Sequence, residues 1–319
     1  MFILGAGHYH PGNVIDNKFL ESLDIGTSDE WILDRVGINT RRTVLPLDYI
    51  QTTRNQDPRI AHELAPNAVT ELGVFAAQLA MKRAKIDPSD IKLCIASVSI
   101  PQACIPANAC LMASELGINA PSLDLNSACS SLLAGLHFIK NMNISGPILL
   151  IQSETYTMAT NYNNRETAVL WGDGASAIIV SHDIAGKAKV IETTFESRPK
   201  DCLTIQIPYG GHFKQEGNRV QRFAITQTES LFNSLNKMSP DTNFIGHQAN
   251  LRMLESVAKR INVSEDRHFF NVDKYGNCGA AGAGSVLSEK WDDFLSGERL
   301  IIATVGAGLS WGGGIINFI

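Results

Sequence analysis

The sequence predicts an α/β fold in which short buried strands alternate with helices around a parallel or mixed sheet. Runs rich in Ile, Val and Leu recur along the chain and are typical of strands covered on both faces. Helix-like stretches separate these runs, as in βαβ units. The 319-residue chain is 44% hydrophobic and only 18% charged, so it is long enough and apolar enough to bury a substantial core.

The strongest helix signal lies at residues 71–85, where Leu72, Phe75 and Leu79 recur on one face and Pro88 follows the end. Six apolar segments, each too short for a helix, are predicted as strands instead. They are residues 2–4, 93–99, 148–152, 177–180, 190–193 and 300–305.

Glycine-rich segments follow the first and the last of these strands, at Gly5-Ala6-Gly7 and Gly306-Ala307-Gly308. Glycines at strand ends supply tight turns, so we expect a turn at each place. The similarity of the two turns suggests a duplicated topology with a joint near residues 180–188. The first turn lacks the third glycine and the acidic partner of a dinucleotide-binding motif, so a bound dinucleotide is not expected.

Charge and composition argue against several classes of protein. The net charge of −5 and the pI near 5.9 disfavour nucleic-acid binding as the main task. No apolar run is long enough to span a membrane, and the first residues lack the basic region of a secretory signal, so we expect a cytoplasmic protein. The six cysteines show neither zinc-ligand nor disulfide spacing, and no metal site is expected.

One cysteine lies in a setting that favours reactivity. Residues 123–136 pass from an apolar strand through small residues to a helix-like segment, which places Cys129 at or just before a helix N-terminus. The helix dipole and free N–H groups there favour the thiolate, so we expect the pKa of Cys129 to be lowered. From this segment alone, a buried structural cysteine is the more common interpretation.

Two further junctions carry hydrogen-bonding side chains. A short apolar segment ends at His247, just before a helix expected at residues 251–260, and small residues surround Asn277 before another helix. Alone, each suits a structural histidine or a turn asparagine. With Cys129 they form a Cys, His, Asn set on three strand-to-helix junctions, which in α/β proteins converge at one end of the sheet.

Six ordered motifs across the whole chain resemble those of the β-ketoacyl-acyl carrier protein synthase III family, which are thiolase-fold condensing enzymes. They begin with Thr27-Ser28-Asp29-Glu30-Trp31-Ile32 followed by Arg35-Val36-Gly37-Ile38. Ser127-Ala128-Cys129, Trp171-Gly172-Asp173-Gly174-Ala175, His247-Gln248-Ala249-Asn250, Gly276-Asn277 and Gly306-Ala307-Gly308-Leu309-Ser310-Trp311-Gly312 then follow in the family's order.

The resemblance implies a duplicated five-layer αβαβα fold, with Cys129 in an N-terminal half at residues 1–182 and the His and Asn in a C-terminal half at residues 183–319. It also implies a homodimer acting in fatty acid biosynthesis. Cys129 would take an acyl group from acyl-CoA, a substrate and not a cofactor, and His247 and Asn277 would serve decarboxylative condensation with malonyl-acyl carrier protein. The N–H groups of Cys129 and Ala307 would form the oxyanion hole.

The same resemblance suggests contacts with the substrates. Trp31, Arg35 and Arg165 match residues that hold the adenine end of CoA, and Asn218 matches a pantetheine contact. Arg252 is expected beside the tunnel, and Ile105 matches a residue of the partner subunit that closes the acyl pocket. Because carrier proteins are acidic, we expect local basic residues to dock them, and Arg222, Lys259 and Arg260 are the candidates, with Arg219 close by.

Four departures from the usual family pattern leave the substrate open. Ala307 replaces a common glycine, Cys278-Gly279 replaces Thr-Ser, Ser130-Ser131 replaces Ala-Gly, and Ile105 replaces a bulky aromatic residue. An acyltransferase or specialised-metabolite ketosynthase with a different acceptor is therefore an alternative. A papain-like hydrolase shares the Cys, His, Asn order but lacks a matching nucleophile motif. A catalytically silent subunit that only shapes a heterodimer is disfavoured because the Cys, His and Asn of the catalytic set are all present.

Overall fold

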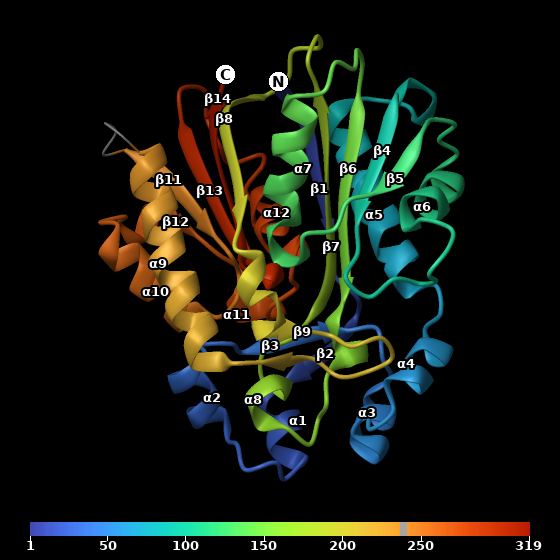
Figure 1. Cartoon of the computed structure of the whole chain (residues 1–319), viewed down its shortest axis with the longest axis vertical. Coiled ribbons are helices and arrows are strands. Elements are labelled where there is room, and N and C mark those ends of the chain that lie inside the picture. The colour runs from blue at the N-terminus through green and yellow to red at the C-terminus, as the bar shows by residue number, and fades with distance from the viewer. Residues whose placement is uncertain (237–240) are drawn as a thin grey trace.

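Among residues 1–236 and 241–319, which the computed structural model describes, ten strands form one central sheet in the order β12-β11-β13-β14-β8-β1-β7-β6-β4-β5 (Figure 1). Their bounds are β1 Phe2–Tyr9, β4 Leu93–Ser97, β5 Ser122–Asp124, β6 Ile148–Thr155, β7 Asp173–Ser181, β8 Ala188–Ser197, β11 Thr242–Gly246, β12 His268–Phe269, β13 Arg299–Gly306 and β14 Ser310–Phe318.

The sheet consists of two five-stranded sets with the same pattern. In β1-β7-β6-β4-β5, the first two pairings are antiparallel and the last two are parallel, and β8-β14-β13-β11-β12 repeats this arrangement. The sets join where Phe2 and Ile3 of β1 pair with Lys189 and Ala188 of β8. The topology is therefore duplicated, as the sequence predicted.

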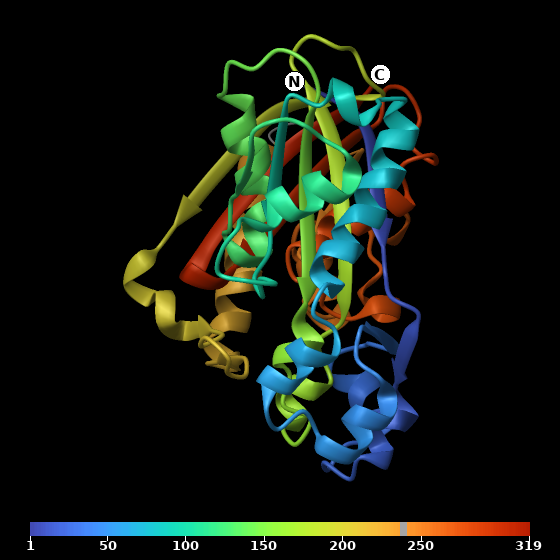
Figure 2. The ribbon, with the colours of Figure 1, turned by 90° about the vertical axis from the view of Figure 1, so that its right-hand side faces the viewer.

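Helices complete five layers. α5 (Ala68–Ala84) and α6 (Asn108–Leu116) cover the outer face of the N-terminal strands, and Figure 2 shows them in front of the sheet. α7 (Ser131–Lys140) and α12 (Ala281–Glu289) lie between the two strand sets and contact both. α9 (Gly217–Leu235) and α10 (Leu251–Arg260) cover the other outer side. The order αβαβα is that of the thiolase fold.

The buried apolar runs reflect this layering. Leu149 of β6 packs in the outer core with α5 and α6, whereas the next residue, Leu150, packs in the central core with α7 and α12. Ile301 and Ile302 of β13 divide in the same way between α9 and the central helices. Because both faces of each strand are covered, these strands lack polar alternation and appear in the sequence as continuous apolar runs.

Smaller elements surround the end of the sheet where β5 and β11 finish (Figure 1). A buried cation links several of them to one another: the Arg41 guanidinium donates to the Val169 carbonyl at 2.6 and 3.0 Å and to Asn17 Oδ1 at 2.6 Å. The elements are β2 Asn13–Asp16, β3 Thr40–Thr43, β9 Ile205–Gln206, β10 Lys214–Gln215, α1 Asn17–Ser22, α2 Asp29–Arg35, α3 Leu47–Thr53, α4 Pro58–Leu64, α8 Arg165–Ala168 and α11 Val272–Tyr275.

The prediction of a turn at Gly5-Ala6-Gly7 is wrong, because these residues lie inside β1. A β-carbon at Gly5 would come within 2.4 Å of the Ala80 carbonyl oxygen, and one at Gly7 within 2.1 Å of the Ala76 carbonyl oxygen. The glycines therefore let α5 pack closely on the strand. The six predicted strands and the helix predicted at residues 71–85 all lie within or overlap observed elements. β14 was not predicted, since its Gly312-Gly313-Gly314 segment resembles a loop.

No helix in residues 1–236 and 241–319 has the length and apolar character needed to cross a membrane.

Candidate active site

The nucleophile turn, residues 126–131, joins β5 to α7 through a 3₁₀ helix at Ala128–Ser130. Ala128 adopts a left-handed conformation with φ of 47°, which costs a non-glycine residue about 1–3 kcal/mol. Side chains hold it there: Asn126 Oδ1 accepts from the Ala128 N–H at 2.8 Å, and the Ser131 hydroxyl donates to the Ala128 carbonyl at 2.7 Å. The strain places Cys129 directly before the helix.

The serines after the nucleophile form a hydroxyl cluster that explains one departure from the family pattern. Ser130 Oγ lies 2.7 Å from Ser310 Oγ and 3.0 Å from Ser127 Oγ. Ser131 Oγ also accepts from the Ser127 N–H at 2.8 Å. These bonds connect the nucleophile turn to the beginning of β14, so the turn is anchored to both halves of the fold.

The two proposed oxyanion donors lie on adjoining segments. A β-carbon at Gly306, the last residue of β13, would lie only 3.0 Å from the Cys129 backbone nitrogen, so the two chains are in close contact. Cys129 and Ala307 each lie in the first turn of a 3₁₀ helix, where N–H groups have no carbonyl acceptor in their own helix. Both residues line the main cavity.

His247 follows β11 directly and is 6% exposed. Burial lowers the pKa of its imidazole to about 4, so the ring is neutral at physiological pH. Within the described part of the chain, its Nδ1 atom has no hydrogen-bond partner. A neutral imidazole with free bonding capacity at a cavity wall is suited to donate a hydrogen bond to a substrate oxygen.

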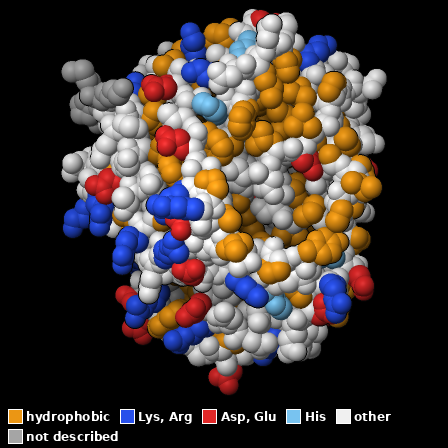
Figure 3. Space-filling model, in the orientation of Figure 1, with side chains coloured by type: hydrophobic (Ala, Val, Ile, Leu, Met, Phe, Trp, Pro, Cys, Tyr) orange, Lys and Arg blue, Asp and Glu red, His pale blue; other side chains and the backbone are white. Residues whose placement is uncertain are grey.

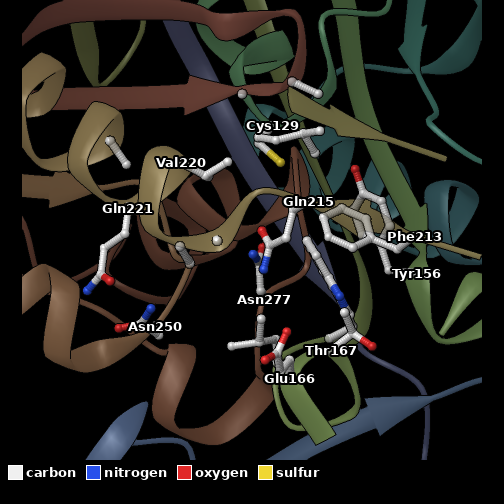
Figure 4. A pocket seen from close by; sticks show the side chains of 18 of the residues that line it. Cys129, Tyr156, Glu166, Thr167, Phe213, Gln215, Val220, Gln221, Asn250 and Asn277 are labelled. Carbon is white, nitrogen blue, oxygen red and sulfur yellow. The ribbon is translucent and has the colours of Figure 1, made fainter. Parts of the chain in front are cut away.

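Asn277 is fixed by its backbone and by its own side chain. Its N–H donates to the Leu170 carbonyl at 2.8 Å, and its carbonyl accepts from the Gly172 N–H at 3.1 Å. Asn277 Oδ1 accepts from the Gly279 N–H at 2.9 Å, which orients the amide and leaves Nδ2 as the donor that is available to a ligand. Figure 4 shows Asn277 at the cavity wall.

The expected lowering of the Cys129 pKa is not observed. Burial raises the pKa of the thiol to about 12, and the carboxylate of Glu154 adds to the increase. Hydrogen bonding by the Tyr156 hydroxyl and by the Cys129 N–H acts in the opposite direction but is weaker. Desolvation therefore outweighs the helix terminus, and the free enzyme holds a neutral thiol.

Cys129, His247 and Asn277 meet in one cavity of about 760 Å³, the size of a small-molecule site. The convergence expected from three strand-to-helix junctions is thus present. Figure 4 shows Cys129 and Asn277 on the wall together with Tyr156 and Phe213. Sequence inspection missed Tyr156, Phe213, Asn250 and Met253 as lining residues. Only Asn250 had a signal, as the last residue of the His247-Gln248-Ala249-Asn250 motif.

Most of the predicted CoA contacts lie at this cavity. Trp31, Arg35 and Asn218 line it, and the Arg165 guanidinium stacks over the Trp31 ring at 5.0 Å. Arg252 is not among the residues that line this cavity, and its contact with the substrate stays a prediction. Its guanidinium donates to the Leu33 carbonyl at 2.9 and 3.1 Å and pairs with Glu255 at 3.0 Å.

Ile105 is 85% exposed on the loop between β4 and α6 and does not line the cavity of its own subunit. The candidate docking residues Arg222, Lys259 and Arg260 are also exposed, on the neighbouring helices α9 and α10. Arg260 pairs with Glu229 at 3.3 Å, and the nearby Arg219 pairs with Asp201. Among the described residues, Arg222 and Lys259 have no ion-pair partner. In Figure 3, lysine and arginine side chains mix with acidic ones over these helices.

Comparisons with known proteins agree with this geometry. Family models described as 3-oxoacyl-[acyl-carrier-protein (ACP)] synthase III and as its C-terminal part match residues 123–199 and 238–318. β-Ketoacyl-[acyl-carrier-protein] synthase III of Clostridioides difficile is 30% identical over 99% of this chain and 98% of its own, and that of Chlamydia trachomatis is 31% identical over the same shares. The crystal structure of the Aquifex aeolicus 3-oxoacyl-[acyl-carrier-protein] synthase III superposes with a TM-score of 0.87 and 27% identity, covering 99% of both chains.

Fold and site together define a thiolase-fold condensing enzyme, an acyltransferase in its chemistry. Within that class, the chain belongs to the β-ketoacyl-acyl carrier protein synthase III family.

The neutrality of His247 leads to a testable prediction. Because burial lowers its pKa to about 4, the ring should not titrate between about pH 5.5 and 8, where a free histidine does. The contribution of this neutral buried ring to folding is present above its unfolded pKa of about 6.5 and is lost as the pH falls toward 4. NMR of imidazole-labelled protein, assigned with His247→Gln, should show a constant His247 shift over that range. An inflection near pH 6.5 would contradict it.

Proposed function

We propose that Cys129 takes an acyl group from acyl-CoA and that the enzyme then joins this group to malonyl-acyl carrier protein by decarboxylative condensation. The main support is the buried, uncharged donor pair of His247 and Asn277, which shares one cavity with Cys129. A cysteine hydrolase needs its histidine as a base, whereas the low pKa of His247 suits a hydrogen-bond donor.

In the loading step, the Cys129 sulfur attacks the thioester carbonyl of acyl-CoA and expels the CoA thiolate. Negative charge develops on the carbonyl oxygen, and the N–H groups of Cys129 and Ala307 stabilise it. Removing one such donor from an enzyme costs about 3–4 kcal/mol of transition-state stabilisation. The methyl group of Ala307 leaves this N–H in place.

In the decarboxylation step, His247 and the Asn277 Nδ2 donate to the thioester carbonyl oxygen of the malonyl group. Carbon dioxide leaves, and the electron pair of the broken bond forms an enolate whose oxygen these two donors stabilise. The enolate carbon then attacks the acyl group on Cys129, and the Cys129 sulfur departs as the new carbon–carbon bond forms. Because both donors are neutral, they do not trap the anion as a cation would.

CoA would enter between α2 and α9, past Trp31, Arg35 and Asn218. Arg165 donates to the Gly26 carbonyl at 2.6 Å and stacks on Trp31, so it supports the platform that would receive the adenine. The exposed guanidinium of Arg35, beside this platform, would supply the positive charge that the CoA phosphates require.

The carrier protein would dock on α9 and α10. Arg222 lies beside Gln221 and Phe223, which line the cavity, and Lys259 lies on the helix that supplies Asn250 and Met253. Since Arg222 and Lys259 form no ion pair with other described residues, they can attract an acidic carrier protein without first losing a partner.

A homodimer would complete the acyl pocket. Large hydrophobic side chains are exposed at Ile105, Phe138 and Leu203, and β5 is an unpaired edge strand. A second cavity of about 500 Å³, lined by Phe138 and Phe195, lies behind the nucleophile turn. Figure 3 shows hydrophobic side chains gathered around a hollow on this face. The partner's Ile105 would fill it.

The proposed division of the chain at residues 182 and 183 follows from the repeated strand pattern, since β7 ends at Ser181 and β8 begins at Ala188. A cytoplasmic location is supported by the exposed free thiols of Cys104, Cys110 and Cys202, which suit a reducing compartment.

Single variants should separate the two half-reactions. Cys129→Ala should abolish acyl loading. His247→Ala and Asn277→Ala should still load an acyl group from acyl-CoA, but their rate of carbon dioxide release from malonyl thioester should fall by at least about 100-fold. Intact-mass analysis and a carbon dioxide assay measure the two steps. If both donor variants lose loading as fully as Cys129→Ala while remaining folded, a hydrolase-like role is the better account.

The same assays distinguish the alternative acyltransferase. A wild-type enzyme that loads acyl groups but never decarboxylates malonyl thioesters would use a different acceptor.

Charge reversal at Arg222 and Lys259 should impair the encounter with the carrier protein. The double variant Arg222→Glu/Lys259→Glu should reduce kcat/KM for malonyl-carrier protein about tenfold at low salt and weaken its dependence on ionic strength. Loading from free acyl-CoA should be nearly unchanged. Lys82→Glu on α5, at the opposite outer layer, is the control. If the double variant loses activity equally with malonyl-carrier protein and with free acyl-CoA, Arg222 and Lys259 are not part of the docking surface.

Substitution at the exposed apolar face should prevent dimer formation. Leu203→Glu should shift the protein from dimer to monomer in sedimentation velocity, because burying a charge in an interface is costly. Leu295→Glu is a matched control, since Leu203 is 71% exposed and Leu295 is 70% exposed. A Leu203→Glu protein that remains dimeric would place the interface elsewhere.

A further inference from the structure

Gln248, the residue directly after His247, is fully buried and takes no part in the steps above. Its side-chain nitrogen donates to the Gly246 carbonyl at 2.8 Å, which fixes the side chain against the end of β11. Its side-chain oxygen accepts from two backbone N–H groups of another segment, that of Asn271 at 3.1 Å and that of Val272 at 3.3 Å. One side chain thus joins the loop that carries His247 to the beginning of α11.

α11 leads directly to Asn277. The Val272 carbonyl accepts from the Gly276 N–H at 2.9 Å, so the turn of helix that Gln248 holds ends one residue before Asn277. Gly276 has a φ of 70°, and a β-carbon there would come within 2.8 Å of the Leu170 carbonyl oxygen, which accepts from the Asn277 N–H. The backbone of Asn277 is therefore fixed by α11 on one side and by Leu170 on the other.

The side chain of Asn277 has further support. Gly279, whose N–H donates to Asn277 Oδ1, lies against the Tyr156 ring, and a β-carbon at Gly279 would come within 2.1 Å of that ring. The ring packs in turn against Trp171 at 4.7 Å between centroids. Figure 4 shows Tyr156 and Asn277 at the wall of the same cavity. These contacts orient the Asn277 amide, and none of them involves the loop of His247.

The His247 ring has less support from hydrogen bonds. Its Nδ1 atom has no partner among residues 1–236 and 241–319, so the placement of the ring depends on the backbone around it. That backbone is fixed at Gln248, which also contacts the helix that follows Asn277: a β-carbon at Gly282 of α12 would lie 2.9 Å from the Gln248 β-carbon. Gln248 therefore contacts the elements on both sides of Asn277.

We propose that Gln248 is a positioning residue that sets the spacing between His247 and Asn277. This inference rests on the decarboxylation step proposed above. The two donors come from different segments, and both must lie about 2.7–3.1 Å from one developing oxyanion. An error of about 1 Å in their separation weakens one of the two hydrogen bonds and can slow a reaction about 100-fold. Gln248 bonds to both segments and so fixes this separation.

The nucleophile turn is held by other contacts. Gly306 packs against the backbone of Cys129, and the Ser130 and Ser310 hydroxyls lie 2.7 Å apart. Loss of the Gln248 hydrogen bonds should therefore slow decarboxylation and spare acyl loading, whereas a residue that only stabilises the fold would affect both steps alike. The loss should appear in kcat and not in KM, because the donors act on charge that develops in the transition state.

The test compares the wild type with Gln248→Met in two assays, single-turnover acylation of Cys129 by acetyl-CoA and carbon dioxide release from malonyl-carrier protein. Methionine keeps the unbranched shape against which α12 packs, but it neither donates to Gly246 nor accepts from α11. The kcat for carbon dioxide release should fall about 10- to 100-fold with KM nearly unchanged. The acylation rate should stay within about twofold of the wild-type rate.

Matched variants separate positioning from packing. Gln248→Glu keeps an oxygen that accepts from the N–H groups of Asn271 and Val272, and it should recover most of the lost rate. Gln152→Met is the control, because Gln152 is also fully buried but its side-chain oxygen accepts from Ser176, within the N-terminal set of strands. Its ratio of carbon dioxide release to acylation should equal that of the wild type. If Gln248→Met does not fold, Gln248→Asn, which is one methylene shorter, should show the same selective loss.

The His247 ring gives a readout that needs no substrate. In Gln248→Met its NMR signals should shift and its pKa should rise from about 4 toward the ordinary value of about 6.5, because a loosened loop admits water. In Gln152→Met the His247 signals should not change. Equal losses of acylation and carbon dioxide release in Gln248→Met, a wild-type ratio of the two rates, or unchanged His247 signals would overturn the positioning role. If the wild type releases no carbon dioxide yet the His247 ring responds as expected, the proposed function is wrong and the positioning role stands.

Discussion

The contact between Gly306 and the backbone of Cys129 is the constraint on which the rest of the site depends. A β-carbon at residue 306 would lie 2.9 Å from the Ser130 nitrogen and 3.0 Å from the Cys129 nitrogen, so only glycine allows β13 to end against the nucleophile turn. This close approach brings a strand of the C-terminal set to a turn of the N-terminal set. It brings Ala307, the residue after Gly306, to the nucleophile turn, and it lets the Ser130 and Ser310 hydroxyls bond. The close contact between the backbones of these two segments thus fixes the framework of the active site, on which the catalytic side chains are placed.

The central helix layer secures what this contact aligns. α7 begins directly after the nucleophile turn, and α12 begins four residues after Asn277. Leu132, Leu133 and Leu136 of α7 are buried between the two strand sets, where truncation of such a side chain typically costs about 2–5 kcal/mol. Both loops therefore lead into helices that are buried between the two strand sets. This apolar packing supports the hydrogen bonds that hold Ala128 in its strained conformation and orient the Asn277 amide.

Local signals in the sequence were sufficient for six of the buried strands, which apolar runs identified. The junctions at Cys129, His247 and Asn277 were ambiguous when taken singly, and the ordered family motifs singled these residues out; the structure brings all three to one cavity. Features that depend on distant partners were missed. Gly5 and Gly7 allow contact with a helix some 70 residues away, and nothing in their neighbourhood distinguishes that from a turn. Arg252 is held by the Leu33 carbonyl, and burial, with the charge of Glu154 adding to it, raises the pKa of the Cys129 thiol, so neither outcome is visible in the local sequence.

The fit of Tyr156 against Gly279 ties two distant parts of the chain to each other. Residue 279 has a φ of 54°, and a β-carbon there would come within 2.1 Å of the Tyr156 ring, so the ring occupies the space that any side chain at residue 279 would need. The two residues lie 123 positions apart in the sequence. Neither position can therefore be redesigned alone: a larger residue at 279 requires a smaller one at 156, and the two have to be changed together.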